Sequence, residues 1–75
     1  MAIKFIRKVK DTEFNFAILA FDRVFGVYPE DMINALWHNG HYAKLWEVKD
    51  DEILIEVDDF LPLEKIQTAF KDYGL

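Results

Sequence analysis

Residues 42–58 read YAKLWEVKDDEILIEVD and form the clearest strand pattern of the chain. A two-residue turn at Asp50-Asp51 would pair residues 42–49 with residues 52–58 and gather most apolar side chains on one face, which predicts a β-hairpin. One face of this hairpin is mostly apolar, and its opposed pairs are Val48 with Ile53, Trp46 with Ile55 and Lys44 with Val57. The other face is mixed and pairs Lys49 with Glu52, Glu47 with Leu54 and Leu45 with Glu56. We expect the mixed face to lie toward water or a partner.

The turn leaves the register of this hairpin open. Two-residue turns favour glycine, and Asp50-Asp51 contains none. A longer turn would shift the pairing by one residue. Because side chains alternate between the two faces, such a shift would turn Trp46 outward.

Residues 2–10 predict a further strand with one polar face. Ile3, Phe5 and Val9 alternate with lysines, although the alternation is interrupted in the middle of the segment. We expect these three apolar side chains to share one side of the strand.

Residues 13–25 predict a helix, because apolar side chains recur there at helical spacing. The Asp-Thr pair at 11–12 suits the N-cap, and Gly26 suits the position after the last turn. The alternative is a hairpin, in which residues 13–20 form a second strand after a turn at residues 10–12. Phenylalanine and isoleucine are compatible with both structures, so the sequence leaves both open.

Two later segments predict helices with clearer boundaries. Pro29 suits the first turn of a helix, Glu30 and Asp31 complement its free N–H groups, and Asn39-Gly40 ends it. A last helix opens at Pro62 and closes at Gly74. One of its faces carries Leu63, Ile66, Phe70 and Tyr73.

Together these segments predict one small α+β domain over residues 1–75. The expected order is β-α-α-β-β-α, with a mainly antiparallel sheet made of the N-terminal strand and the hairpin, and about three helices packed against it. The order of the strands within the sheet does not follow from the sequence.

The composition shows more aromatic side chains than so short a chain can bury. Seven Phe, three Tyr and two Trp occur without a single cysteine, so disulfides and thiolate metal sites cannot supplement the core. A domain of this size buries only about 60% of its unfolded surface. We therefore expect several rings at the surface. Since no apolar stretch is long enough for a signal peptide or a membrane span, we also expect a cytoplasmic protein that binds no membrane.

Charge is distributed unevenly along the chain. Four of the nine basic residues and none of the 14 acidic residues fall within the first ten positions, namely Lys4, Arg7, Lys8 and Lys10. The strongly acidic remainder repels a phosphate backbone, so we do not expect nucleic acid as the main partner. An acidic surface favours a protein partner with a basic surface.

No motif predicts a catalytic, cofactor or metal site. His38 and His41 flank a glycine turn, but a catalytic metal would need a third ligand from Glu30 or Asp31. The acidic turns do not have the glycine-centred calcium pattern, and the chain contains no serine nucleophile. We expect no enzyme, no cofactor and no metal.

We interpret the chain as a small acidic protein-binding module without catalytic activity. Tyrosine and tryptophan commonly dominate binding energy, so the candidate anchors are Tyr28, Trp37, Tyr42, Trp46 and Tyr73. The acidic side chains of the hairpin region form the expected electrostatic rim: Asp50, Asp51, Glu52, Glu56, Asp58 and Asp59. A short, acidic, aromatic-rich composition is also typical of phage or mobile-element accessory proteins that bind and inhibit or modulate a host protein.

Two other classes of function remain open. The surplus rings also suit a self-associating structural or regulatory unit, such as a homodimer formed through a strand edge or a helix face. The third class is a winged-helix-like nucleic-acid binder, with residues 29–39 as the reading helix, residues 42–58 as the wing and the basic N-terminal strand against phosphate. The carboxylates in the reading helix and the wing oppose this third class.

Overall fold

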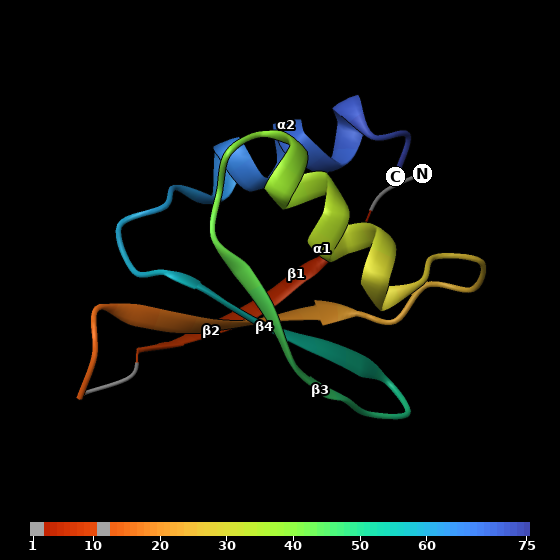
Figure 1. Cartoon of the computed structure of the whole chain (residues 1–75). Coiled ribbons are helices and arrows are strands. Elements are labelled where there is room, and N and C mark those ends of the chain that lie inside the picture. The colour runs from red at the N-terminus through yellow and green to blue at the C-terminus, as the bar shows by residue number, and fades with distance from the viewer. Residues whose placement is uncertain (1–2, 11–12) are drawn as a thin grey trace.

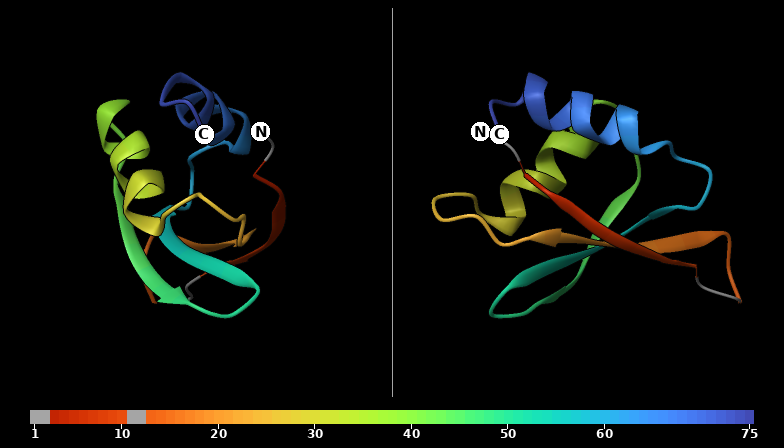
Figure 2. Two further views of the ribbon diagram at one scale, coloured as in Figure 1. Left: turned by 90° about the vertical axis from the view of Figure 1, so that its right-hand side faces the viewer. Right: turned by 180° about the vertical axis from the view of Figure 1, so that it is seen from behind.

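The computed structural model describes residues 3–10 and 13–75. Strands β1 (Phe5–Lys10), β2 (Phe16–Asp22), β3 (Ala43–Val48) and β4 (Glu52–Asp58) form one antiparallel sheet in the order β1-β2-β4-β3. Helices α1 (Pro29–His38) and α2 (Leu63–Asp72) lie on the same face of this sheet, as Figure 1 and the rotated views in Figure 2 show. The domain therefore has two layers, and one face of the sheet has no helix over it. Within the described residues, neither helix is long and apolar enough to cross a membrane.

The predicted order with about three helices is wrong, because the observed order is β-β-α-β-β-α with two helices. Residues 13–25 hold β2 instead of a helix, as in the hairpin alternative. β2 is a central strand that pairs with β1 on one side and with β4 on the other. Both of its faces carry apolar residues, and a continuous apolar run does not distinguish a buried strand from a helix. The expected N-cap and the alternative turn at residues 11–12 lie outside the described residues.

The two remaining helices begin and end where the sequence predicts. Pro29 opens α1, and Gly40 follows its end with a φ of 77°, a left-handed conformation that favours glycine. Pro62 precedes the first residue of α2, and Gly74 follows its last turn. Gly26 is not a helix cap. It lies in the turn between β2 and α1.

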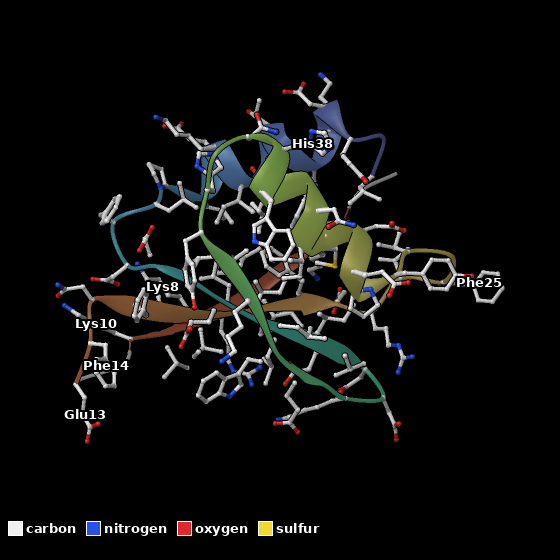
Figure 3. All side chains as sticks on the ribbon, in the orientation of Figure 1. Lys8, Lys10, Glu13, Phe14, Phe25 and His38 are labelled. Atoms are coloured by element: carbon white, nitrogen blue, oxygen red, sulfur yellow. The ribbon has the colours of Figure 1, made fainter. Side chains whose placement is uncertain are left out.

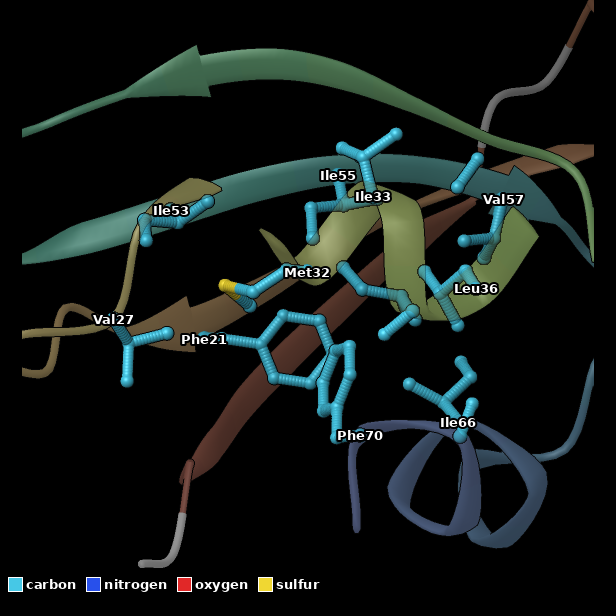
Figure 4. Packing of buried hydrophobic residues seen from close by; sticks show 14 residues of the cluster. Phe21, Val27, Met32, Ile33, Leu36, Ile53, Ile55, Val57, Ile66 and Phe70 are labelled. Carbon is cyan, nitrogen blue, oxygen red and sulfur yellow. The ribbon is translucent and has the colours of Figure 1, made fainter. Parts of the chain in front are cut away.

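The core fills the space between the helices and the sheet (Figure 4). The rings of Phe21 on β2 and Phe70 on α2 meet edge to face, with their centroids 5.4 Å apart. Around them, the fully buried large side chains come from α1, α2 and β4: Met32, Leu36, Ile66, Ile53, Ile55 and Val57. β4 therefore supplies three of the largest fully buried side chains of the core.

A bulge in β1 separates two residues that the sequence predicts on the same side. Phe5 is opposite Phe21 on the helix-covered face, whereas Val9 is opposite Ile18, whose side chain points to the other face. The register shifts between Phe5 and Arg7. One extra residue in a strand reverses the alternation of the side chains that follow it, so the expected common side of Phe5 and Val9 is wrong.

A second bulge decides where Trp46 points. The predicted turn is present, since Lys49 N–H donates to the Glu52 carbonyl at 2.8 Å, and Val48 is opposite Ile53 as expected. The register then shifts between Leu45 and Glu47, so that Leu45 takes the position opposite Ile55 that Trp46 was expected to hold. The other expected pairs beyond the bulge are wrong for the same reason, because Lys44 is opposite Glu56 and Ala43 is opposite Val57. The bulge thus lies inside the strand and not at the turn.

Candidate functional site

The sheet face without helices is the candidate site, and we call it the open face. Alternation along the strands assigns to it every second residue of β2 and β4, namely Phe16, Ile18, Ala20 and Asp22, and Glu52, Leu54, Glu56 and Asp58. The register adds Arg7 and Val9 from β1, and Lys44 and Glu47 from β3. The open face therefore combines apolar residues around Ile18, Ala20 and Leu54 with charged residues, among them Glu56 beside Ile18.

A hollow of about 360 Å³ lies on the open face. Its deepest residues are small or covered, because Ala20 is 1% exposed and Leu54 is 7% exposed. Trp46 and Val9 rise on either side and are 53% and 54% exposed. The complete lining is Arg7, Val9, Lys10, Ile18, Ala20, Trp46 and Leu54. The hollow can therefore receive an apolar group about the size of a side chain.

Three aromatic rings form a row beside this hollow. The ring centroids of Phe14 and Phe16 are 6.4 Å apart, and those of Phe16 and Tyr42 are 5.1 Å apart. Figure 3 shows Phe14 at the end of the β1–β2 hairpin, away from both helices. The row joins the start of β2 to the residue before β3, so it crosses from one half of the chain to the other.

The row ends at a covered carboxylate. The Tyr42 hydroxyl donates to Glu56 Oε1 at 2.6 Å, and Glu56 is 9% exposed. This hydrogen bond is the largest cause of a raised pKa at Tyr42, since the neighbouring carboxylate disfavours loss of the hydroxyl proton. Tyr42 therefore keeps its proton and its hydrogen bond at neutral pH.

A second carboxylate on the open face, that of Glu52 on β4, is paired with Arg7 of the edge strand β1. Arg7 donates two hydrogen bonds to Glu52, Nη1 to Oε2 at 2.7 Å and Nη2 to Oε1 at 2.9 Å. The Arg7 hydrogen bonds lower the pKa of Glu52, and Lys49 Nζ adds a contact at 3.5 Å. Arg7 lies opposite Ala20 on β2, and its guanidinium reaches past this small residue to β4. The bond therefore ties β1 to β4 across the strand between them.

The basic residues of β1 are neutralised by the acidic half of the chain. Lys8 and Lys10, which Figure 3 shows at the same end of the molecule, lie 3.1 Å and 3.3 Å from the carboxylate of Asp59. The hydrogen bond from Lys8 is the first cause of a lowered pKa at Asp59. Together with Arg7, three of the four N-terminal cations are thus engaged by carboxylates. These pairs weaken the case for a phosphate contact through β1.

The predicted aromatic anchors are divided between the two sides of the molecule. Tyr42 and Trp46 belong to the open face, while Tyr28 caps α1 on the helix side. Trp37 is on α1 and donates its indole N–H to the Ala43 carbonyl at 2.9 Å. Tyr73 follows α2, and its ring lies 5.5 Å from that of His38, which is labelled in Figure 3. The five side chains do not form one surface.

The predicted acidic rim is divided in the same way. Glu52, Glu56 and Asp59 accept hydrogen bonds or ion pairs from within the domain, so they are partly or largely satisfied already. Asp50 and Asp51 are exposed at the tip of the β3–β4 hairpin. Only the tip of the hairpin therefore matches the expected solvent-facing rim.

Three residues of the open face are absent from the predicted site. Val9, Phe14 and Ile18 contribute to the hollow or to the row of rings, whereas Leu54 lies on the hairpin face that is expected toward water or a partner. The predicted helix over residues 13–25 includes Phe14 and Ile18. The signal that identifies Ile18 is the run FAILAF at residues 16–21, which is apolar at every position and therefore fits a strand with two apolar faces.

A second apolar surface lies between α1 and the edge strand β3. Its lining includes Ile33, Trp37 and Leu45, and β3 pairs only with β4 within the described sheet. An edge strand of this kind can accept another strand. The groove is therefore an alternative place for association.

Across residues 3–10 and 13–75, no three His, Asp or Glu side chains are grouped as metal ligands would be. Comparisons with known proteins give no match, whether with family models, with curated proteins or with solved structures.

Proposed function

We propose that this protein is a non-catalytic binding module that docks on another protein through the open face of its sheet. The observation that carries the proposal is Trp46. A bulge turns this large ring out of the hairpin, where it stands more than half exposed beside an apolar hollow. Tryptophan beside a preformed hollow is typical of binding-energy centres at protein interfaces.

The chemistry of the open face also supports a protein partner. Interfaces combine an apolar, aromatic centre with a polar border. Here the hollow and the row formed by Phe14, Phe16 and Tyr42 supply the centre. Exposed carboxylates at the hairpin tip supply part of the border. The excess of acidic residues favours a partner whose matching surface is basic.

As a binding module, the protein would act on its partner through contact alone. A domain that binds without a catalytic site acts by covering a surface or by holding two proteins together. Inhibition or modulation of a host protein, as by phage or mobile-element accessory proteins, is the form of this function that we favour.

Affinity capture from a lysate of the native host tests the proposal. The bait is the folded chain, and bound proteins are identified by mass. We expect Trp46→Ala to reduce capture of a specific protein by at least about tenfold, as for a residue at the centre of an interface. The matched control is Tyr28→Ala, which removes an exposed ring from the helix side. Equal capture by wild type and Trp46→Ala, with a loss only in Tyr28→Ala, would contradict the proposal.

Self-association through the groove beside β3 is the second candidate function. It is favoured by one observation, the unpaired edge of β3 next to Trp37 and Leu45. Light scattering at micromolar concentration tests it. A monomer would contradict it, and a dimer that Leu45→Lys converts to a monomer would support it.

A further inference from the structure

Glu56 is a covered carboxylate at the centre of the open face. It is the register partner of Ile18 on β2 and of Lys44 on β3, and it follows Leu54 of the hollow by two residues. Its neighbours leave it 9% exposed although no helix lies over it. Carboxylates are rarely so covered unless they are paired.

The pairing of Glu56 within the domain is incomplete. An ionised carboxylate can accept about four hydrogen bonds, and Tyr42 occupies one position at Oε1. No side-chain oxygen in the described residues is both sealed from solvent and without a hydrogen-bond partner. Glu56 Oε2, for which the structure shows no protein donor, therefore remains in contact with solvent.

Lys44 is the cation that the register brings opposite Glu56. It is exposed, and it makes none of the ion pairs found among the described residues. Arg7, another cation of the open face, is already paired with Glu52, and Lys49 also contacts Glu52. The domain thus holds a covered negative charge next to aromatic rings and does not neutralise it itself.

Docking on the open face changes the state of Glu56. A partner that covers the face removes the remaining water from Oε2, and a desolvated carboxylate without a further donor is costly. A cation from the partner removes this cost. The rings of Tyr42 and Phe16, 5.1 Å apart, also favour a cation beside them.

A second copy of the chain fits this position poorly. Paired by its open face, it would bring its own Glu56 and the surrounding carboxylates into the same interface. Like charges that face one another across an interface oppose association. The charge of the open face therefore favours a different protein with the opposite sign.

We infer that Glu56 is the receptor for an arginine or lysine side chain of the partner protein, with the rings of Tyr42 and Phe16 beside the bound cation and the adjoining hollow filled by an apolar group. This inference rests on the proposed function, because it names the chemistry that the open face selects.

A titration with short peptides tests the inference while the partner is still unidentified. The probe is acetyl-Leu-Arg-Leu-amide, and the matched control replaces arginine by citrulline, which has a similar shape and no charge. Amide shifts of the labelled protein report where each peptide binds. We expect the arginine peptide to shift residues 18, 42 and 56 and to bind at least about tenfold more tightly than the citrulline peptide, as for a charge-assisted hydrogen bond.

Two variants separate a specific site from a general attraction to an acidic protein. Glu56→Gln keeps an acceptor for Tyr42 and should remove the preference for the arginine peptide. Asp51→Asn removes one charge at the exposed turn and should leave the preference unchanged. A third variant, Lys44→Met, should increase the affinity for the arginine peptide by removing a nearby positive charge.

Several outcomes would overturn the inference. The arginine and citrulline peptides could cause equal shifts, or the shifts could be confined to the hairpin tip. Asp51→Asn could reduce the preference for the arginine peptide as much as Glu56→Gln does. The arginine peptide could also fail to bind up to millimolar concentration. The cation site and the proposed function can fail independently. If Trp46→Ala releases a captured protein and Glu56→Gln does not, the open face is still the docking surface and only the cation site is disproved.

Discussion

The two faces of the sheet are both covered in the middle, but by different means. On the helix side, Ile53 and Ile55 of β4 are completely buried by α1 and α2. On the open face, Glu52, Leu54 and Glu56 of the same strand are also buried, although no helix covers them. Side chains from neighbouring strands do so, such as Arg7 over Glu52 and Tyr42 over Glu56. A cover made of side chains can be rearranged or extended by a partner, while a cover made of helices cannot be changed without unfolding.

The largest expected difference between the faces is in stability. Ile55→Ala removes a fully buried side chain from the core, and we expect it to lower the free energy of unfolding by about 2–5 kcal/mol. Val9→Ala on the open face removes one of the exposed walls of the hollow and should cost no more than about 0.5 kcal/mol. Urea unfolding followed by circular dichroism measures both values. Equal losses in the free energy of unfolding would mean that Val9 on the open face contributes as much to stability as the core residue Ile55.

How far the sequence predicts this fold is best seen in β2 and α1. Pro29, the acids after it and Gly40 act within one turn of the chain, so the limits of α1 follow from local physical chemistry. Residues 16–22 form a strand through two pairings, a hairpin with β1 and a pairing with β4, which lies 30 or more residues further along. The apolar run alone is compatible with a helix or with the hairpin. Its structure therefore depends in part on a non-local partner that the local sequence does not reveal.

The second comparison concerns how the stability of the protein changes at low pH. Glu52 has a lowered pKa because Arg7 hydrogen-bonds its charged form, and a group with a lowered pKa in the folded state contributes stability that is present at neutral pH. This contribution is lost as the pH falls below about 4, the ordinary value for a glutamate, and through the lower pKa of the folded state. Asp59, whose pKa is lowered first by Lys8, changes in the same direction. We expect the unfolding midpoint to fall steeply in this range.

Two arginine variants identify the source of that acid sensitivity. Arg7→Gln should lower stability at pH 7 and make the decline between about pH 5 and 3 shallower. The matched control is Arg23→Gln, because the Arg23 guanidinium donates to the Lys49 carbonyl, a group that does not titrate. If both variants keep the steep decline of the wild type, the bond that ties β1 to β4 is not its cause.

The two tryptophans give a third comparison at nearly equal exposure. Trp37 is 58% exposed and hydrogen-bonds the Ala43 carbonyl, so Trp37→Phe should cost about 1 kcal/mol of stability. Trp46 has no such bond in the described structure, and Trp46→Phe should cost about half of this or less. Thermal unfolding measures the difference. A reversed order would indicate that Trp46 holds the sheet together and is not available to a partner.

The candidate site was predictable only in part, and the reasons are physical. The surplus of aromatic residues correctly indicated exposed rings, since eight of the twelve are exposed. The direction of Trp46 depends on a bulge that no local signal marks. The bonds of Arg7 with Glu52 and of Tyr42 with Glu56 join residues 45 and 14 positions apart. The first depends on the strand order, and the second on the register of the β3–β4 hairpin. Composition therefore predicts what the open face is made of and not how its side chains are arranged.

The last comparison concerns Tyr42, where the expected effect is again small. Tyr42→Phe removes one hydrogen bond at a partly exposed site, so the loss at pH 7 should be about 0.5 kcal/mol. The raised pKa of Tyr42 gives the effect a pH dependence: the contribution is complete below about pH 10, the ordinary value for a tyrosine, and is lost as the pH rises through the higher pKa of the folded state.

Stability curves of wild type and Tyr42→Phe should therefore converge in strong alkali. Tyr42→Phe also exposes Glu56 to water, because it removes the hydroxyl that donates a hydrogen bond to this carboxylate. If Glu56 is the receptor for a cation, Tyr42→Phe should leave the preference for the arginine peptide intact while it weakens the fold. A variant that loses both together would mean that Tyr42 and not Glu56 selects the cation.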